Sequence, residues 1–305
     1  MDGSVARPRP MLALGIRLLA AGILATMAML VKLAATKGVH LAELIFWRQA
    51  ITLIAITAIL FITGRFSQTK TTRFGAHFRR SITGLTGMFF LYGAVTILPL
   101  AEATAIGFAA PFFAVMLSVV LFGEKVGKYR WGAVILGFAG VLLITQPGLS
   151  GNVDPIGAAL GLIAAFLVAL ISFQVQDLNK DESPWTIVFW FTLITTPLMG
   201  LGLPFVIQEH DTDTWLIIFA MAGFGALGQI LLTTSLRFGS AAVIIVMDYT
   251  SLLWATIYGA VIFSTTPSSM LWIGSPLIVA AGLLIAWRER KLIQQALAMP
   301  AREAP

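Results

Sequence analysis

The chain has 305 residues, of which 58% are hydrophobic and 11% are charged, and its mean hydropathy is +0.90. Soluble domains carry about 25% charged residues, so this composition excludes a water-soluble globule. Cysteine is absent, which excludes disulfide bonds, a thiolate nucleophile and cysteine-ligated metals. We assign the net charge of +6 to loops on one side of a membrane, and we expect no nucleic-acid partner.

Ten apolar segments are long enough to cross a bilayer, for which a helix needs about 20 residues. A backbone inside lipid must satisfy its own hydrogen bonds, so these segments are predicted to be helices. The predicted fold class is therefore an all-α integral membrane protein. We expect the ten helices at residues 12–35, 41–63, 79–98, 100–122, 129–147, 155–177, 184–207, 213–236, 239–263 and 269–288.

Lysine and arginine gather at alternate ends of these segments. The connection between the second and third segments holds Arg65, Lys70 and Arg73, with Arg79 and Arg80 directly after it. The connections around residues 99, 152 and 268 hold no lysine or arginine. The positive-inside rule therefore places both termini in the cytoplasm.

The second half of the chain repeats the first. Residues 131–144 are echoed by residues 272–285, and Phe46-Trp47 is echoed by Phe189-Trp190, at offsets of 141 and 143 residues. Five segments in each half would turn the second half upside down, which is typical of secondary transporters. We expect a cytoplasmic tail at 1–10, five-helix repeats at 11–147 and 155–288, an outer linker at 148–154, and a second cytoplasmic tail at 289–305.

Several short motifs of the first half belong together. They are Ala101-Glu102-Ala103-Thr104-Ala105, Pro111, Leu121-Phe122-Gly123-Glu124-Lys125, Trp131-Gly132 and Gly137-Phe138-Ala139-Gly140-Val141. This pattern resembles the EamA repeat of the drug/metabolite transporter superfamily, and Arg48 in the second segment fits it. The second half departs from the pattern: Phe263-Ser264-Thr265 replaces the Phe-Gly-Glu turn, and Phe191 stands where Arg48 would recur.

The resemblance implies a ten-helix carrier in which the third, fourth, eighth and ninth helices surround a central cavity. Within the superfamily the chain resembles the YddG-type amino-acid exporters of bacterial inner membranes, although the EamA motif does not encode the substrate.

Charged groups inside lipid are costly, so each is a candidate for function. Arg48 lies roughly 10 Å into its helix at 1.5 Å per residue, where it holds a substrate carboxylate, pairs with Glu43 or extends outward to the membrane surface. Asp248 has no basic residue nearby in sequence, and we assign it to a substrate amine or to proton coupling, which Asp248→Asn would abolish. Glu102 is expected to be an interfacial carboxylate at a helix N-terminus, and Lys32 is expected to extend toward the outer surface.

Neutral polar and aromatic side chains in these helices are further candidates for substrate contact, with packing or interhelical hydrogen bonds as the alternative for each. They are Tyr92, Phe108, Gln174, Trp190, Gln229, Tyr249 and Trp254. Pro111 and Pro197 lie inside predicted helices, where proline can kink the backbone, and we assign them to hinges or cavity walls.

No Walker A sequence, His-Glu-x-x-His motif or Gly-x-Ser-x-Gly elbow is present, so we expect neither an enzyme nor a cofactor. The predicted function is a secondary carrier for a small metabolite, with amino-acid export, including aromatic amino acids, as the first hypothesis. Another metabolite such as S-adenosylmethionine, a drug-like cation, and a flippase for lipid carriers are the alternatives. The expected partners are the small-molecule substrate and the lipid bilayer, and both a monomer and a homodimer stay open.

Overall fold

The computed structural model describes residues 10–123, 127–145, 153–238 and 245–298, and all regular secondary structure in these ranges is helical. Eight helical stretches are long and apolar enough to cross a membrane. The α-helices are α1 (Pro10–Thr36), α2 (Leu41–Ile62), α3 (Phe74–Ile97), α4 (Leu100–Gly107), α5 (Ala110–Phe122), α6 (Lys128–Thr145), α7 (Pro155–Leu178), α8 (Pro184–Gly202), α9 (Thr212–Phe238), α11 (Thr250–Ile262) and α12 (Ser269–Ala298). Three short 3-10 turns, η1 (Phe66–Thr69), η2 (Leu203–Phe205) and η3 (Ile245–Tyr249), lie between them.

Local sequence explains where several helices begin. Asp154 accepts a hydrogen bond from the Gly157 amide at 2.9 Å, and Pro155 follows it in the first turn of α7. Ser183 accepts from the Thr186 amide at 3.2 Å in the same way, ahead of α8. A side-chain oxygen before the helix accepts from an otherwise unpaired amide, and a proline at the first position has no amide hydrogen that would need a partner.

The predicted segment 100–122 is divided into α4 and α5 at Phe108 and Ala109, just before Pro111, and the role of Pro111 as a hinge stays a prediction. Pro111 has no amide hydrogen to donate to the Gly107 carbonyl, and its ring crowds that carbonyl. The chain therefore leaves the α-helix at Phe108, whose amide bonds the Ala105 carbonyl at 3.2 Å instead. Pro111 lies in the first turn of α5.

Other boundaries differ from the predicted ones. The third helix begins at Phe74 and not at residue 79, so Arg79 and Arg80 lie inside α3 rather than at its start. The predicted helix 239–263 is described from residue 245 onward, where η3 leads into the 13-residue α11. The predicted tail 289–305 is helical as far as Ala298, because α12 continues without a break. Glu124, most of the expected tail 1–10 and most of the linker 148–154 lie outside the described residues.

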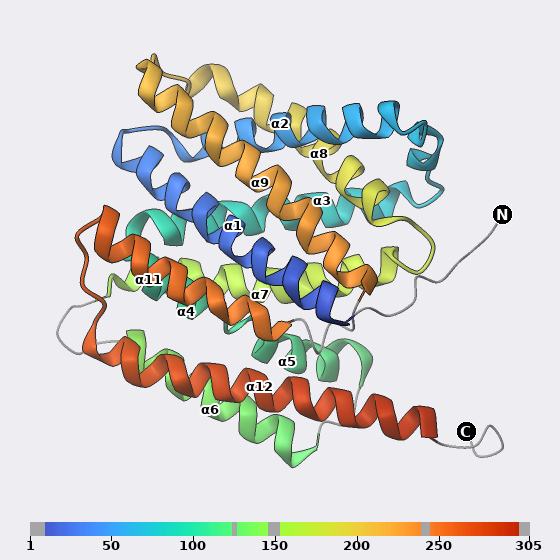
Figure 1. Ribbon diagram of the computed structural model, residues 1–305, viewed down its shortest axis with the longest axis vertical. Helices are drawn as coiled ribbons and strands as arrows, with labels where there is room; N and C mark the ends of the chain where they lie inside the picture. The colour runs from blue at the N-terminus through green and yellow to red at the C-terminus, as the bar shows by residue number, and fades with distance from the viewer. Residues whose placement is uncertain (1–9, 124–126, 146–152, 239–244, 299–305) are drawn as a thin grey trace.

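The helices of the two halves are interleaved (Figure 1). Along one edge of the bundle α6 lies beside α12, and along the opposite edge α2 packs against α8 and α9. Between these edges α1 packs on α9 and α11, and α3 packs on α7 and α8. The start of α1 and the end of α12 lie at the same end of the bundle (Figure 1).

The two repeated runs, 131–144 and 272–285, pack on each other. Gly140 of α6 and Gly274 of α12 meet backbone to backbone: a Cβ added at Gly140 would lie 2.8 Å from the Gly274 carbonyl oxygen, and a Cβ added at Gly274 would lie 2.6 Å from that of Gly140. Small residues allow such approach, and close approach is what stabilises helix pairs in lipid. The shared runs thus form a contact between the halves.

Candidate functional site

Arg80 is buried inside α3 without a hydrogen-bond acceptor among the described residues. Its side chain is only 7% exposed, and its Nε and Nη1 atoms have no partner. The guanidinium lies over the ring of Phe191 on α8, with 3.8 Å between its central carbon and the ring centre. Gly84, one turn further along α3, leaves room for this stack, because a Cβ there would lie 2.8 Å from the Phe191 ring and 2.9 Å from Arg80 Nη1.

Arg48 enters the same region from α2. Its Nη1 donates to Gln49 Oε1 at 3.0 Å and lies 3.3 Å from Met88 Sδ, while its Nε has no partner. Gln49 in turn donates to the Thr195 hydroxyl on α8 at 2.6 Å, which fixes the amide that Arg48 contacts. The expected alternative, a pair with Glu43, is wrong, because Glu43 is held elsewhere.

Glu43 is fully buried and bonds His210, with 3.0 Å from Nε2 to each carboxylate oxygen. It also accepts from the Trp47 indole at 3.4 Å. Glu43 therefore joins the start of α2 to the connection before α9, and Arg48 is left without a carboxylate partner.

The two guanidiniums lie at neighbouring levels of one helix face. Arg80 reaches Gly84, and Arg48 reaches Met88, four residues later on α3, which is a rise of about 6 Å. Their positive charges repel each other, since each lies in the other's field. In the part of the chain that the structure describes, no carboxylate lies within 4 Å of either group.

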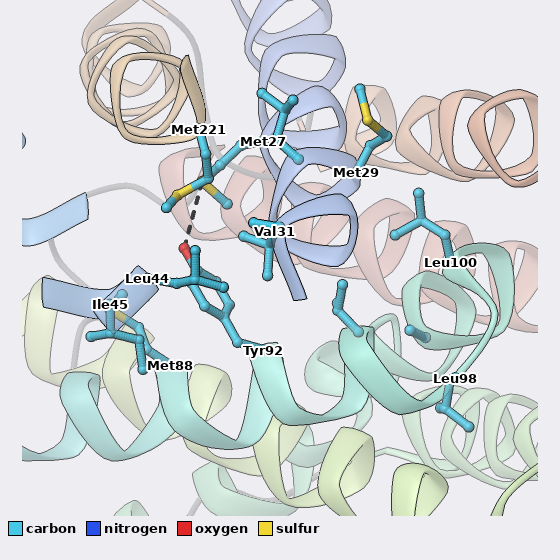
Figure 2. Close-up of a cluster of buried hydrophobic side chains, with 14 of the residues drawn as sticks. Met27, Met29, Val31, Leu44, Ile45, Met88, Tyr92, Leu98, Leu100 and Met221 are labelled. Atoms are coloured by element: carbon cyan, nitrogen blue, oxygen red, sulfur yellow. Dashed lines mark hydrogen bonds between the residues drawn. The ribbon is translucent and has the colours of Figure 1, made fainter. Parts of the chain in front are cut away.

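Buried apolar side chains, among them Met27, Met88 and Met221, lie around Tyr92 further along α3 (Figure 2). The Tyr92 hydroxyl, next along this face of α3, points toward Met27 Sδ at 3.7 Å, and Met221 of α9 lies beside them. Methionine fills irregular space and adapts to different surfaces. Two of the predicted contacts, Arg48 and Tyr92, are thus brought to the same region.

The end of the bundle where α3 finishes is closed by Lys32 and Glu102, both buried. Lys32 Nζ donates to the carbonyls of Val95, Thr96 and Leu98 at 3.0, 3.3 and 2.5 Å. The expectation that Lys32 extends to the surface is wrong, because these carbonyls end α3 and attract a cation. Glu102, expected at the interface, is 2% exposed, and its Oε1 accepts from the Ser268 amide at 3.1 Å.

Lys32→Met should lower the free energy of unfolding by about 2 kcal/mol, since it leaves buried carbonyls without their charged donor. Lys37→Met is the matched control, because Lys37 is 37% exposed and its only ion pair among the described residues is at 3.9 Å, with Asp211. Melting temperatures of the two purified variants in one detergent would check this. Equal melting temperatures would show that Lys32 does not stabilise this end of the bundle.

Asp248 is not the unpaired carboxylate that the sequence indicated. It lies in η3 and accepts two hydrogen bonds from Arg17 of α1, at 2.6 Å from Nε and 2.5 Å from Nη2. The side chains are 11% exposed for Arg17 and 31% for Asp248. This bidentate pair joins α1 to the segment that precedes α11.

The other aromatic candidates of the second half make packing contacts. The Tyr249 ring, at the end of η3, meets the ring of Phe108, at the break after α4, edge to face at 4.9 Å. Trp254 stacks on Tyr258 at 6.1 Å and lies against Gly22 of α1. None of these contacts reaches Arg48 or Arg80, so a role in substrate contact for them stays a prediction.

Three remaining candidates lie toward the end of the bundle where α3 begins. Trp190 donates to the Thr69 carbonyl at 2.8 Å. Gln174 donates to the Thr83 hydroxyl at 3.2 Å and lines a hollow of about 510 Å³ between α3, α5 and α7. Gln229 borders a small apolar crevice between α2, α8 and α9. Pro197 lies inside α8, and its role as a hinge stays a prediction.

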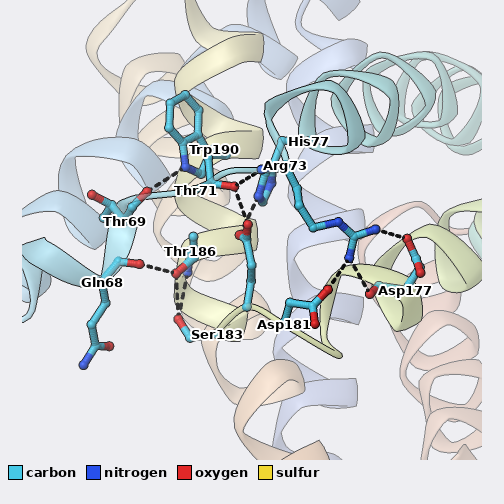
Figure 3. A network of polar contacts seen from close by, with 11 residues as sticks. Gln68, Thr69, Thr71, Arg73, His77, Asp177, Asp181, Ser183, Thr186 and Trp190 are labelled. Carbon is cyan, nitrogen blue, oxygen red and sulfur yellow. Dashed lines mark hydrogen bonds and ion pairs between the residues drawn. The ribbon is translucent and has the colours of Figure 1, made fainter.

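A polar cluster closes the same end of the bundle (Figure 3). Arg73, just before α3, pairs with Asp177 and with Asp181, the latter at 2.9 Å, and the hydrogen bond that Arg73 donates to Asp177 raises the pKa of Arg73. His77 contacts Glu182 at 2.6 Å, and Glu182 also accepts from Thr71. These contacts tie the start of α3 to the connection between α7 and α8.

Sequence reasoning missed Arg80 and Arg17. Arg80 was grouped with Arg79 as a loop charge, although a helix starting at Phe74 places it about 9 Å inside α3. Arg17 lies within the first predicted helix. A charge inside an apolar segment is the signal that could have identified it.

Comparison with known proteins agrees with this architecture. The sequence profile of the EamA-like transporter family matches residues 11–146 and 155–287. A riboflavin transporter of Rhizobium johnstonii is 30% identical over 70% of this chain and 71% of its own length. The pseudopaline exporter CntI of Pseudomonas aeruginosa is 26% identical over 80% and 86%. One solved crystal structure, 18% identical, superposes with a TM-score of 0.63 over 93% of this chain and 98% of that one, and so shares the fold.

Proposed function

Because this chain belongs to the EamA-like transporter family, we propose that it is a secondary carrier that moves a small metabolite across the bacterial inner membrane by alternating access. The proposal includes ten membrane crossings, two inverted five-helix halves and cytoplasmic termini. The substrate is proposed to meet Arg48 and Tyr92 between α2, α3 and α8.

The main support for this proposal is that helices of one half pack against helices of the other half in reciprocal pairs. The first helix of the first half, α1, packs on α9, the third helix of the second half. The first helix of the second half, α7, packs on α3, the third of the first half. A two-fold relation between the halves predicts such reciprocal pairs, and two similar halves can rock against each other to expose one site to either side.

Amino-acid export, the first hypothesis from the sequence, has no support among the relatives reported above. Their names concern riboflavin and pseudopaline, so another metabolite fits better. We propose a water-soluble metabolite with both a flat or apolar part and polar groups. The side chains of Met27, Met88 and Met221 would contact the flat or apolar part. Arg48 and Arg80 would bind the polar groups.

The purified protein in liposomes should exchange labelled riboflavin, or another metabolite of a panel that includes S-adenosylmethionine and aromatic amino acids. Exchange is measured as uptake of label into vesicles preloaded with the unlabelled compound, against protein-free vesicles. Saturable uptake of one compound supports the carrier. Uptake equal to that of protein-free vesicles across the whole panel would count against it, and uptake confined to amino acids would restore the first hypothesis.

A further inference from the structure

We propose that Arg48 and Arg80 bind, as a pair, an oxyanion group of the transported metabolite, either a carboxylate or a phosphate. This inference rests on the proposed carrier function and names the chemical class of its substrate. It assigns to Arg80 a substrate-binding role.

The unmet hydrogen-bond capacity of Arg80 is the first argument. A buried guanidinium without a partner is among the costliest groups in a protein, and it becomes favourable when an anion supplies the missing acceptors. Other buried ionisable groups in the described residues do have protein partners: Lys32 has three carbonyls, Glu43 has His210, and His77 has Glu182. Arg80, with two unpartnered nitrogens, and Arg48, with an unpartnered Nε, are therefore donors whose capacity the described residues do not fully use.

The second argument is that both groups are held in place. Arg80 is stacked on Phe191 in the space left by Gly84, and Arg48 is fixed by Gln49, which Thr195 holds in turn. A guanidinium presents its donors as a rigid planar fork that fits two oxygens of a carboxylate or phosphate. Two guanidinium groups separated by about one helical turn suit an anion with several oxygens, because each arginine can donate hydrogen bonds to different oxygens.

The third argument is the like charge of the pair. Arg48 and Arg80 repel each other while the site is free of anion, so binding of a negative group relieves the repulsion. Phe191 occupies the position at which Arg48 would recur in the second half, and it lies under Arg80. The two halves thus contribute different parts to one site.

The test compares ligands that differ in one charged group. Riboflavin 5′-phosphate is compared with riboflavin, and nicotinate with nicotinamide, at constant ionic strength set with chloride. The purified full-length protein in detergent is titrated with each, and the shift of its melting temperature gives a half-saturating concentration. In at least one pair the charged member should bind about tenfold more tightly than the neutral one. The phosphate pair and the carboxylate pair show which oxyanion the site prefers.

Arg80→Gln should remove this preference for the charged member, whereas Arg79→Gln should retain it. Arg79 is the matched control, because it is the adjacent arginine on α3 but is exposed. Should Arg80→Gln fail to fold, Gly84→Ala keeps both charges and displaces the guanidinium, and it should also remove the preference. Equal binding of charged and neutral members, or equal behaviour of the Arg80 and Arg79 variants, would overturn the proposal.

Flux separates this inference from the proposed carrier function. If riboflavin is exchanged by the wild type and by Arg80→Gln at the same rate, and no charged ligand binds better, the carrier stands and the oxyanion site fails. If the charged ligands bind through Arg80 but no compound crosses the liposome membrane, the site stands and the carrier fails.

Discussion

Gly140→Leu should destabilise the protein by about 3 kcal/mol, because its side chain has no space between α6 and α12. The nearest atoms to an added Cβ are the Gly274 carbonyl oxygen and a side-chain carbon of Ile278, both at 2.8 Å. A backbone carbonyl cannot move aside as a flexible side chain can, so the two helices must separate. We expect a large fall of the melting temperature in detergent and a lower yield of folded protein.

Gly132→Leu is the control for this variant. Gly132 is on the same helix, is exposed, and has no atom within 4 Å of an added Cβ. Leucine is a better helix former than glycine, by up to about 1 kcal/mol, so this substitution should leave stability unchanged or raise it. If both variants melt at the same temperature, the close contact of α6 and α12 does not hold the halves together.

Arg17→Met should cost about 3 kcal/mol, because it leaves the Asp248 carboxylate partly buried and without its bidentate partner. Asp248→Asn should have a smaller effect in the same direction, and it should reduce flux at every pH rather than change the pH dependence. This expectation replaces the one drawn from the sequence, in which Asp248 had no partner and served proton coupling. Melting curves and pH profiles of exchange in liposomes would check both.

The double variant Arg17→Met/Asp248→Leu tests whether the effect comes from the unpaired charge. Removing both charges leaves no uncompensated group, so the double variant should recover most of the stability that Arg17→Met loses. Additive losses in the double variant would instead mean that each side chain stabilises the protein by packing alone.

The relation between the halves explains which parts of the site the sequence could indicate. The runs that both halves share, around Trp131 and Trp272, pack on each other in the structure. Arg48, which the two halves do not share, lies in the candidate site. Asp248 is also unshared, yet it is paired with Arg17. A difference between the copies therefore marks an asymmetric position, and the partner of the residue decides whether that position can meet substrate.

By itself, the sequence determined the helical class, most helix positions and the family resemblance, because these follow from apolar length, loop charge and short motifs along the chain. Only the tertiary structure decided which charges are satisfied. Arg17 meets Asp248 across 231 residues, and His210 meets Glu43 across 167, whereas Arg80 meets an aromatic ring and no carboxylate among the described residues. Whether a buried charge is compensated depends on helices that are distant in sequence, and so the arginine pair became visible only in the packed bundle.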